Sequence, residues 1–143
     1  MATGVLKIYR DSTGGQMKSA MKNILIVDSD LGFIYWLGAV LIAADYQPWP
    51  ACSPSDAISV MDRKPSVRLD LLIVNASLPG VSKTIAHFRR TQADLKVMAL
   101  GPQGKALPGI NAWRRKPGLI DDSAKREWVR AVEYMSSGQD RAA

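Results

Sequence analysis

An apolar segment in the middle of the chain constrains the fold more than any other feature. In residues 69–74 every residue except Asp70 is apolar, and the segment stops at Asn75, before a Leu-Pro-Gly turn. A short apolar segment bounded by turn residues is typical of a strand that is buried on both faces. Ligands and chemistry gather beyond the carboxyl ends of such strands, so an uncharged amide stands where reactive groups are usually found.

Strand-like and helix-like segments alternate along the chain. We predict strands over residues 24–27, 46–51, 69–74, 96–100 and 112–115. We predict helices over residues 31–44, 54–62, 82–90 and 121–135. Asp30 and Ser53 are the expected N-caps of the first two helices, and Pro54 suits the first helical position. This alternation indicates a parallel sheet that is covered by helices on both faces.

Two prolines predict the place of one strand in that sheet. Pro48 and Pro50 lie two residues apart, so the backbone N–H groups that they lack would point to the same side of the strand. Such a strand has to lie at an edge of the sheet with that side facing outward. In the 2-1-3-4-5 order of flavodoxin-like proteins the second strand is an edge. We therefore predict a flavodoxin-like, three-layer α/β sandwich with a five-stranded parallel sheet in this order.

Composition narrows the class of protein further. The 143 residues are 47% hydrophobic and 22% charged, which is typical of a single globular domain. Cys52 is the only cysteine, which excludes an internal disulfide and a cysteine-based zinc cluster and favours a reducing compartment. Residues 1–21 lack an apolar signal core, and the longest uncharged stretch, residues 31–44, is too short to cross a bilayer. We expect a soluble cytoplasmic protein without membrane association.

The net charge of +6 is unevenly distributed along the chain. Between Lys83 and Lys116 there are eight basic residues and one acid, Asp94. Such a surface attracts acidic partners, among which nucleic acid is one candidate. No recognition motif or aromatic stacking pattern accompanies the charge, so we do not expect nucleic acid to be the partner. A nucleic-acid-binding regulator with a basic surface stays an alternative.

The ends of several predicted strands carry a recognisable set of motifs. These are ILIVDSD at residues 24–30, DLLIVNASLPG at 70–80, KVMALGP at 96–102 and AWRRKP at 112–117. Together and in this order they resemble the CheY-like receiver domain of two-component response regulators. The resemblance covers residues 22–136, which leaves an N-terminal extension of residues 1–21 and a C-terminal tail of residues 137–143.

The resemblance implies five pocket positions and one switch aromatic. In that family an aspartate at the end of the third strand accepts a phosphoryl group from a histidine kinase. An acid pair follows the first strand, a Thr or Ser ends the fourth, and a Lys precedes a Pro. Carried over by position, these places are taken by Asn75 (phosphoacceptor), Asp28 and Ser29 (acid pair), Gly101 (hydroxyl), Lys116 (lysine) and Trp113 (switch aromatic). Three of the five pocket positions therefore depart from the family pattern.

These departures affect the chemistry directly. An amide oxygen without formal charge is not the anionic nucleophile that phosphoryl transfer needs. Mg²⁺ prefers charged oxygen ligands, and Ser29 and Asn75 remove two of them. We expect no metal, no cofactor and no enzymatic activity, and predict a degenerate pseudo-receiver that acts independently of phosphorylation. A phosphoacceptor domain using Asp28 or Asp30, and a decaying site in which Asn75 is a tolerated loss, are the alternatives.

We also predict a fixed arrangement of this pocket. The Asn75 amide would donate to Asp28, while its oxygen accepts from Lys116. A second departure from the family lies between Gly101 and Trp113, where two prolines and two glycines break helices. The fourth helix of the family is therefore expected to be short or missing.

Residues 31–44 contain no charge, so the predicted first helix is apolar on every side. Such a helix is either wholly buried or part of an interface. We predict a protein interface with a signalling partner or a second copy, a homodimer being the simplest case. Its candidate residues are Phe33, Tyr35, Trp36, Val40 and Trp128. Alternatively the extension, which has strand character at residues 4–10, covers the helix.

Overall fold

The structure is a computed structural model that describes residues 21–101 and 107–141. The strand character predicted for residues 4–10 lies outside this part of the chain. The described residues form β1 (Lys22–Val27), α1 (Leu31–Ala43), β2 (Tyr46–Ala51), α2 (Pro54–Asp62), β3 (Leu71–Asn75), α3 (Val81–Arg89), β4 (Val97–Leu100), β5 (Ala112–Arg114) and α4 (Asp122–Arg141).

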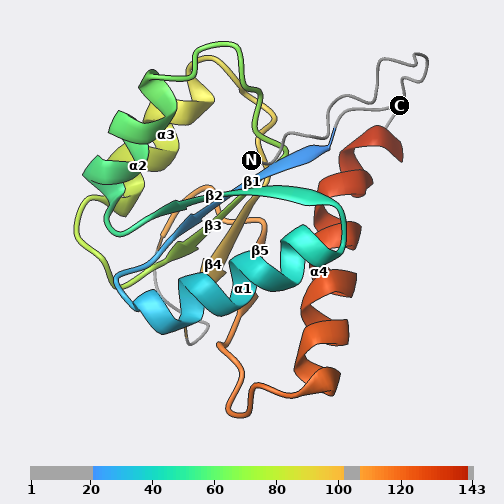
Figure 1. The fold of residues 1–143 in the computed structure, drawn as a ribbon. Coiled ribbons are helices and arrows are strands. Elements are labelled where there is room, and N and C mark those ends of the chain that lie inside the picture. Colours follow the sequence, from blue (N-terminus) through green and yellow to red (C-terminus); the bar gives the residue numbers. More distant parts are fainter. Residues whose placement is uncertain (1–20, 102–106, 142–143) are drawn as a thin grey trace.

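The strands form one parallel sheet in the order β2-β1-β3-β4-β5, as predicted (Figure 1). The strand with the two prolines is an edge, and Pro48 and Pro50 lie opposite Ile24 and Ile26 of β1. Helices α2 and α3 cover one face of the sheet, and α1 and α4 cover the other. The carboxyl ends of β1, β3 and β4 therefore meet at one end of the molecule, where the predicted pocket residues lie.

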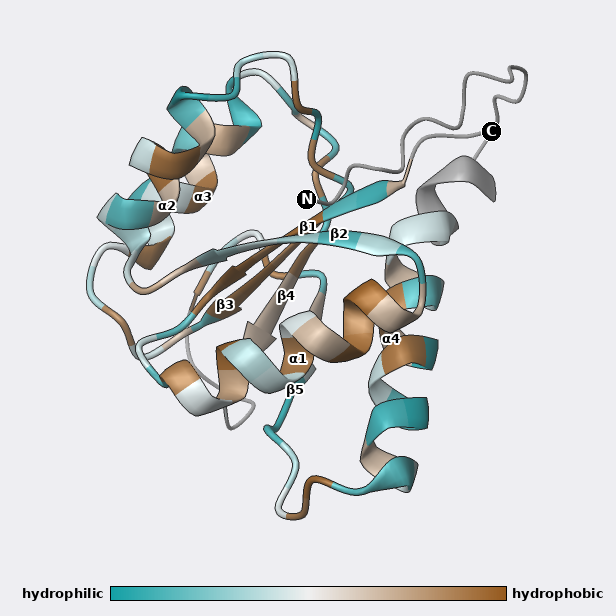
Figure 2. Cartoon of the chain, viewed as in Figure 1, coloured by the Kyte–Doolittle hydropathy of each residue, from teal (hydrophilic) through white to brown (hydrophobic). Residues whose placement is uncertain are grey.

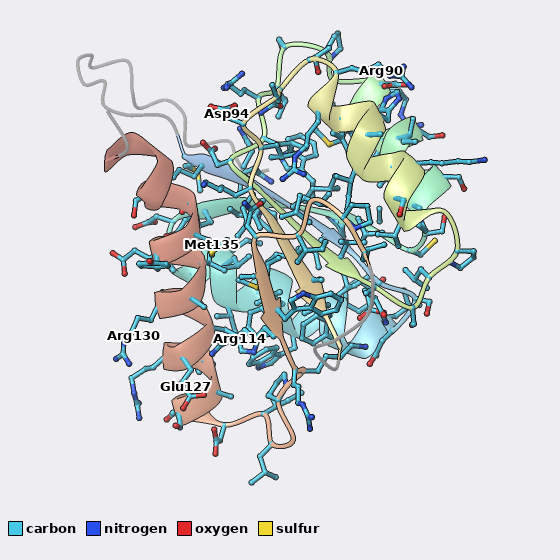
Figure 3. All side chains as sticks on the ribbon, turned by 180° about the vertical axis from the view of Figure 1, so that it is seen from behind. Arg90, Asp94, Arg114, Glu127, Arg130 and Met135 are labelled. Carbon is cyan, nitrogen blue, oxygen red and sulfur yellow. The ribbon has the colours of Figure 1, made fainter. Side chains whose placement is uncertain are left out.

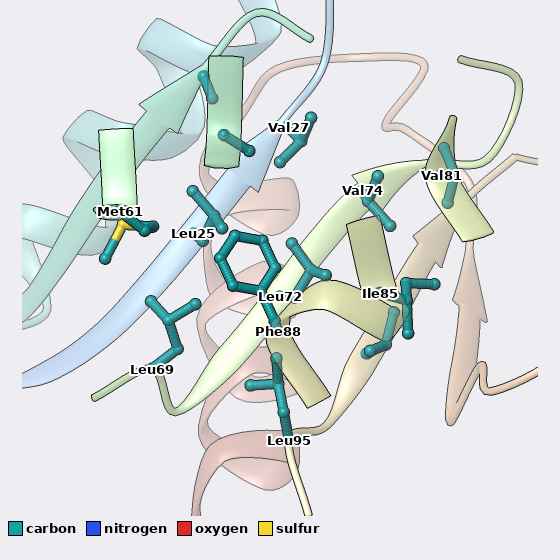
Figure 4. Packing of buried hydrophobic residues seen from close by; sticks show 13 residues of the cluster. Leu25, Val27, Met61, Leu69, Leu72, Val74, Val81, Ile85, Phe88 and Leu95 are labelled. Carbon is teal, nitrogen blue, oxygen red and sulfur yellow. The ribbon is translucent and has the colours of Figure 1, made fainter. Parts of the chain in front are cut away.

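Each face of the sheet has its own hydrophobic core. The core under α2 and α3 is built around Leu25, Leu72, Val74 and Phe88 (Figure 4). The core under α1 and α4 includes Trp128, which is buried between the sheet and α1. Alternate residues of the central strands enter opposite cores, which explains why β1 is apolar from Ile24 to Val27 and β3 from Leu71 to Val74 (Figure 2).

The predicted starts of the first two helices are confirmed. The Asp30 carboxylate accepts a hydrogen bond from the Phe33 N–H at 3.1 Å. Ser53 Oγ accepts from the Asp56 N–H at 3.1 Å, and Pro54 occupies the first position of α2. Both caps satisfy backbone donors that a helix leaves without a partner in its first turn.

The structure explains the acid that interrupts the central apolar segment. The Asn23 N–H donates to Asp70 Oδ2 at 2.8 Å, and the Asp70 N–H donates to the Asn23 carbonyl at 2.8 Å. Asp70 therefore lies beside the start of β1, and β3 begins at Leu71 rather than at residue 69. A polar residue is tolerated here because its carboxylate accepts a hydrogen bond from the backbone of Asn23.

The last helix is longer than predicted. α4 continues to Arg141, so most of the segment expected to be a tail is helical. Two contacts accompany this continuation: Ser137 Oγ donates to the Glu133 carbonyl at 2.6 Å, and Lys22 Nζ donates to the Ser136 carbonyl at 3.1 Å. In the described part of the chain, no helix has both the length and the apolar character that spanning a membrane requires.

The connection from β4 to β5 contains no helix in its described residues, Gly101 and 107–111. Leu107 and Ile110 pack against the core under α2 and α3. Arg89 fixes the end of this connection, because its guanidinium donates to the Leu95 carbonyl at 2.7 Å and to Asn111 Oδ1 at 3.0 Å. In the described residues, this face of the sheet beside α3 is therefore covered by a loop that Arg89 holds in place.

Candidate functional site

The centre of the site is Asp28, the first residue after β1. Its side chain is fully buried at 0% exposure, and its backbone N–H donates to the Ala51 carbonyl at 3.1 Å. Asp28 Oδ1 accepts from the Asp30 N–H at 3.2 Å and from Asn75 Nδ2 at 3.0 Å. The last of these bonds is the predicted contact between the amide and the carboxylate.

The Asn75 amide is bonded at both of its polar atoms. Its Oδ1 accepts from the Ser77 N–H at 2.9 Å and from Ser77 Oγ at 2.7 Å. A carboxylate only accepts and a backbone N–H only donates, so these partners define which atom of the amide faces Asp28. The prediction that Asn75 Oδ1 accepts from Lys116 is therefore wrong, because the local turn to Ser77 satisfies that oxygen.

The ammonium of Lys116 pairs with two carboxylates instead. Its Nζ lies 2.6 Å from Asp28 Oδ2 and 3.3 Å from Asp30 Oδ2. The ammonium also lies 5.2 Å from the centre of the Phe33 ring, on the first turn of α1. One side chain that follows β5 thus holds together the end of β1 and the start of α1.

These contacts shift two pKa values in opposite directions. Burial by itself lowers the pKa of Lys116, but the hydrogen bonds and charges of Asp28 and Asp30 outweigh it, and the pKa is raised. The pKa of Asp30 is lowered, first by the hydrogen bond from the Phe33 N–H and then by that from Lys116. Both groups are therefore held in their charged forms at neutral pH.

The remaining predicted residues lie around this cluster without joining it. Ser29 is exposed, and Trp113 lies half-buried in β5, opposite Ala99 of β4. Gly101 has a φ of +132°, which side-chain-bearing residues rarely adopt, and its N–H donates to the Arg114 carbonyl at 3.0 Å. A hydroxyl residue at position 101 would therefore be strained, although the space beside it is open.

The residues present do not fit a bound Mg²⁺. Asp28 Oδ1 already accepts two N–H groups, and Oδ2 faces the Lys116 ammonium. Among the described residues, no group of three or more His, Cys, Asp or Glu side chains converges on a common point. A divalent cation needs free, charged oxygens, and here the buried carboxylate is neutralised by a cation of the protein itself.

A surface pocket borders the cluster, lined by Asn75, Leu100, Gly101, Arg115 and Lys116. Its two charged residues are cations, and Asn75 contributes an amide. None of the described residues that line this pocket is an anionic nucleophile, so they offer contacts to a ligand but no group that attacks a phosphoryl donor.

Most of the residues predicted to form an interface are not available on the surface. Phe33, Val40 and Trp128 are buried within the protomer, because α4 packs against α1 and the rings of Phe33 and Trp128 lie 5.6 Å apart. Trp36 is half-buried and packs against the same core, whereas Tyr35 is 70% exposed. Of the five candidates, only Tyr35 is exposed.

Some residues of the site and the surface were missed at the sequence level. Ser77 satisfies the Asn75 oxygen, and the Asn-Ala-Ser spacing of an Asx turn was the signal for it. On α1, Leu31 and Ile42 are exposed together with Tyr35. Their helical spacing places them in one outward stripe. The sequence did not reveal this stripe, because the helix is apolar on every side and the stripe is recognised only once the buried residues are known.

Comparison with known proteins supports the fold. No family model and no curated protein sequence matches the chain. A CheY-like receiver domain protein from Methanospirillum hungatei has a TM-score of 0.69 and 15% identity, over 86% of this chain and 99% of that chain. A receiver domain protein from Clostridium thermocellum has a TM-score of 0.65 and 14% identity, over 86% and 100%.

A chemotaxis response regulator of Vibrio cholerae is similar too, with a TM-score of 0.60 and 19% identity over 78% of this chain and 98% of that chain. At identities this low the likeness concerns the fold. The chain therefore has the fold of response regulator receiver domains, as its strand-end motifs predicted.

Proposed function

We propose that this protein is a receiver-like signalling module of the cytoplasm that works without phosphorylation and without enzymatic activity, as an adaptor that binds other proteins. The observation that carries the proposal is Asn75. The strand-end motifs that resemble receiver domains align it with the phosphoacceptor of that family, and hydrogen bonds from Ser77 and to Asp28 use both of its polar atoms. An amide held in this way does not attack a phosphoryl donor.

The two nearby carboxylates are poor substitutes as acceptors. Asp28 is fully buried and paired with Lys116, so a phosphoryl donor has no access to it. Asp30 is more accessible, but its carboxylate caps α1 and pairs with the same lysine. Phosphorylating Asp30 would turn its carboxylate into an acyl phosphate, which moves the negative charge from the carboxyl oxygens that both contacts use to the phosphoryl group.

The proposal is tested by incubating the full chain with acetyl phosphate and Mg²⁺ and measuring its intact mass. We expect no phosphoryl adduct, and no change in Trp fluorescence on addition of beryllofluoride. A double variant, Asn75→Asp with Ser29→Asp, serves as the matched control in which an acceptor and a second acid are restored. A stoichiometric adduct on the wild-type protein would falsify the proposal.

For the interaction itself we propose the outward stripe of α1, formed by Leu31, Tyr35 and Ile42. These side chains are 53%, 70% and 60% exposed, and none of them carries a charge. Contiguous apolar surface is uncommon on monomers and marks interaction sites. The simplest occupant is the same stripe of a second copy across a two-fold axis, because one self-complementary patch then suffices.

A further inference from the structure

The two edge strands of the sheet, β2 and β5, differ in their capacity to form backbone hydrogen bonds with a further strand. β2 carries Pro48 and Pro50, which lack N–H groups, whereas Ala112, Trp113 and Arg114 of β5 all have them. The Arg114 carbonyl accepts a hydrogen bond from the Gly101 N–H, which follows β4. The backbone polar groups of Arg114 therefore point toward β4, into the sheet. Backbone groups of successive residues in a strand point to opposite sides, and those of Trp113 therefore point outward. No described strand lies on that side.

An apolar groove runs beside this edge, between β5 and α4. Its floor contains Met98, Ala112, Ala131 and Met135, and its volume is about 440 Å³. Arg114, Glu127 and Arg130 also line it, and Figure 3 shows them on this side of the molecule. A groove of this kind next to an open strand edge offers backbone pairing and side-chain burial to the same ligand.

The charged residues that line the groove are two cations, Arg114 and Arg130, and one acid, Glu127. Lys116 is neutralised in the pocket, but Arg114, Arg115 and Arg130 form no ion pair with any residue that the structure describes. Arg114 lies 5.2 Å from the centre of the Trp128 ring, which holds its guanidinium beside the groove without removing its charge.

We propose that β5 and the groove bind an extended, acidic peptide segment of a partner protein by strand addition. The peptide pairs with the outer edge of β5, places an apolar side chain over Met98 and Met135, and presents carboxylates to Arg114 and Arg130. The inference rests on the proposed function as a protein-binding module and names the chemistry of one partner.

Two other occupants suit the site less well. A second copy paired through β5 would bring the same cation-rich edge against itself, which is electrostatically unfavourable. Nucleic acid would satisfy the cations, but its phosphate backbone makes no use of an apolar floor. An acidic peptide with alternating apolar residues can pair with the backbone of β5, bury apolar side chains in the groove and place carboxylates near the cations.

The test uses fluorescein-labelled peptides of about eight residues, long enough for one strand. The probe alternates Glu and Val; one control alternates Lys and Val, and another carries Pro at every second position of the Glu peptide. We expect fluorescence anisotropy to show binding of the Glu–Val peptide, at least about tenfold weaker binding of the Lys–Val peptide, and loss of binding with proline. Equal binding of the first two peptides, or undiminished binding of the proline peptide, overturns the proposal.

Variants of the full chain locate the binding. Ala131→Arg fills the groove and should abolish binding, whereas Arg126→Glu, a charge change elsewhere on α4, should weaken it much less. Circular dichroism verifies that both variants are folded. Undiminished binding to Ala131→Arg, or stronger binding of labelled oligothymidine than of the Glu–Val peptide, contradicts strand addition. A phosphoryl adduct with peptide binding intact would overturn only the proposed function.

Discussion

The ion pair between Lys116 and Asp28 joins a residue after β5 to a buried carboxylate after β1. In Lys116→Met the carboxylate loses its cation but stays buried. Removing one partner of a fully buried pair costs about 3–5 kcal/mol. Because the Lys116 side chain is 31% exposed, we expect a smaller loss of unfolding free energy, about 2–3 kcal/mol in urea titrations.

The adjacent Arg115→Met is the matched control for this variant. Arg115 is exposed and pairs with no described acid, so its removal should change the free energy of unfolding little. Adding Asp28→Asn to Lys116→Met should recover part of the loss, since an amide leaves no uncompensated charge. If Lys116→Met and the double variant lost the same free energy of unfolding, the stabilising role assigned to the ion pair would be contradicted.

The shifted pKa values predict how stability depends on pH. The pKa of Asp30 is lowered from 3.8, so its charge stabilises the fold above pH 3.8, and this contribution is lost as the pH falls through the lower, folded-state pKa. The pKa of Lys116 is raised from 10.5, so its contribution is present below pH 10.5 and lost as the pH rises through the folded-state pKa.

Asp30→Asn separates the charge of Asp30 from its capping role, because asparagine is also a good N-cap. In urea titrations from pH 2 to 7, the advantage of the wild type over Asp30→Asn should therefore be present at neutral pH and shrink below pH 3.8. An advantage that stays constant across this range would show that the charge makes no contribution.

Introducing a carboxylate at position 75 tests the proposed independence from phosphorylation. Asn75→Asp alone should label poorly with acetyl phosphate, because Ser29 supplies no second acid and Lys116 neutralises Asp28. Adding Ser29→Asp should increase labelling and make it depend on Mg²⁺, as measured by intact mass. Gly101→Ser should help little, since a φ of +132° strains any side chain there. Full, metal-dependent labelling of the single variant would contradict this description of the pocket.

At the scale of elements, the prolines of β2 protect one edge of the sheet. Pro48→Val with Pro50→Val restores two outward N–H groups and raises strand propensity. We expect the double variant to keep its fold but to self-associate at high concentration, as measured by light scattering. Pro65→Val, in an exposed loop after α2, is the control and should stay unchanged. Equal scattering from both variants would mean that the prolines do not protect the edge.

For the whole molecule, the proposed two-fold dimer is tested through Tyr35. Wild-type protein should sediment as a dimer, and Tyr35→Glu should shift it to a monomer, because an unpaired charge in an apolar interface is unfavourable. Trp36 is a poorer choice, since it packs against the core and its replacement would also destabilise the protomer.

Tyr134→Glu is the matched control for this measurement. Tyr134 is also a tyrosine with 70% exposure, but it lies on α4, away from the α1 stripe. Its replacement should leave the sedimentation coefficient unchanged. A monomeric wild-type protein, or equal effects of the two variants, would refute the dimer.

The sequence by itself determined the sheet order and the caps of α1 and α2. These properties are local or topological. Apolar segments bury strands, Asp30 and Ser53 bond to backbone within their own turns, and the prolines exclude β2 from the interior of the sheet. That residue 75 is an amide and not a carboxylate is likewise read from the sequence alone, whatever the fold.

Only the tertiary structure decided which groups meet. Lys116 and Asp28 come together because β5 and β1 end at the same side of the sheet, while the Asn75 oxygen finds a nearer partner in Ser77. Helix α1 is apolar on every side, so its sequence did not distinguish the inward face, with Phe33 and Val40, from the outward face, with Tyr35. The packing of α4 across it made that distinction, because burial depends on contacts between residues far apart in the chain.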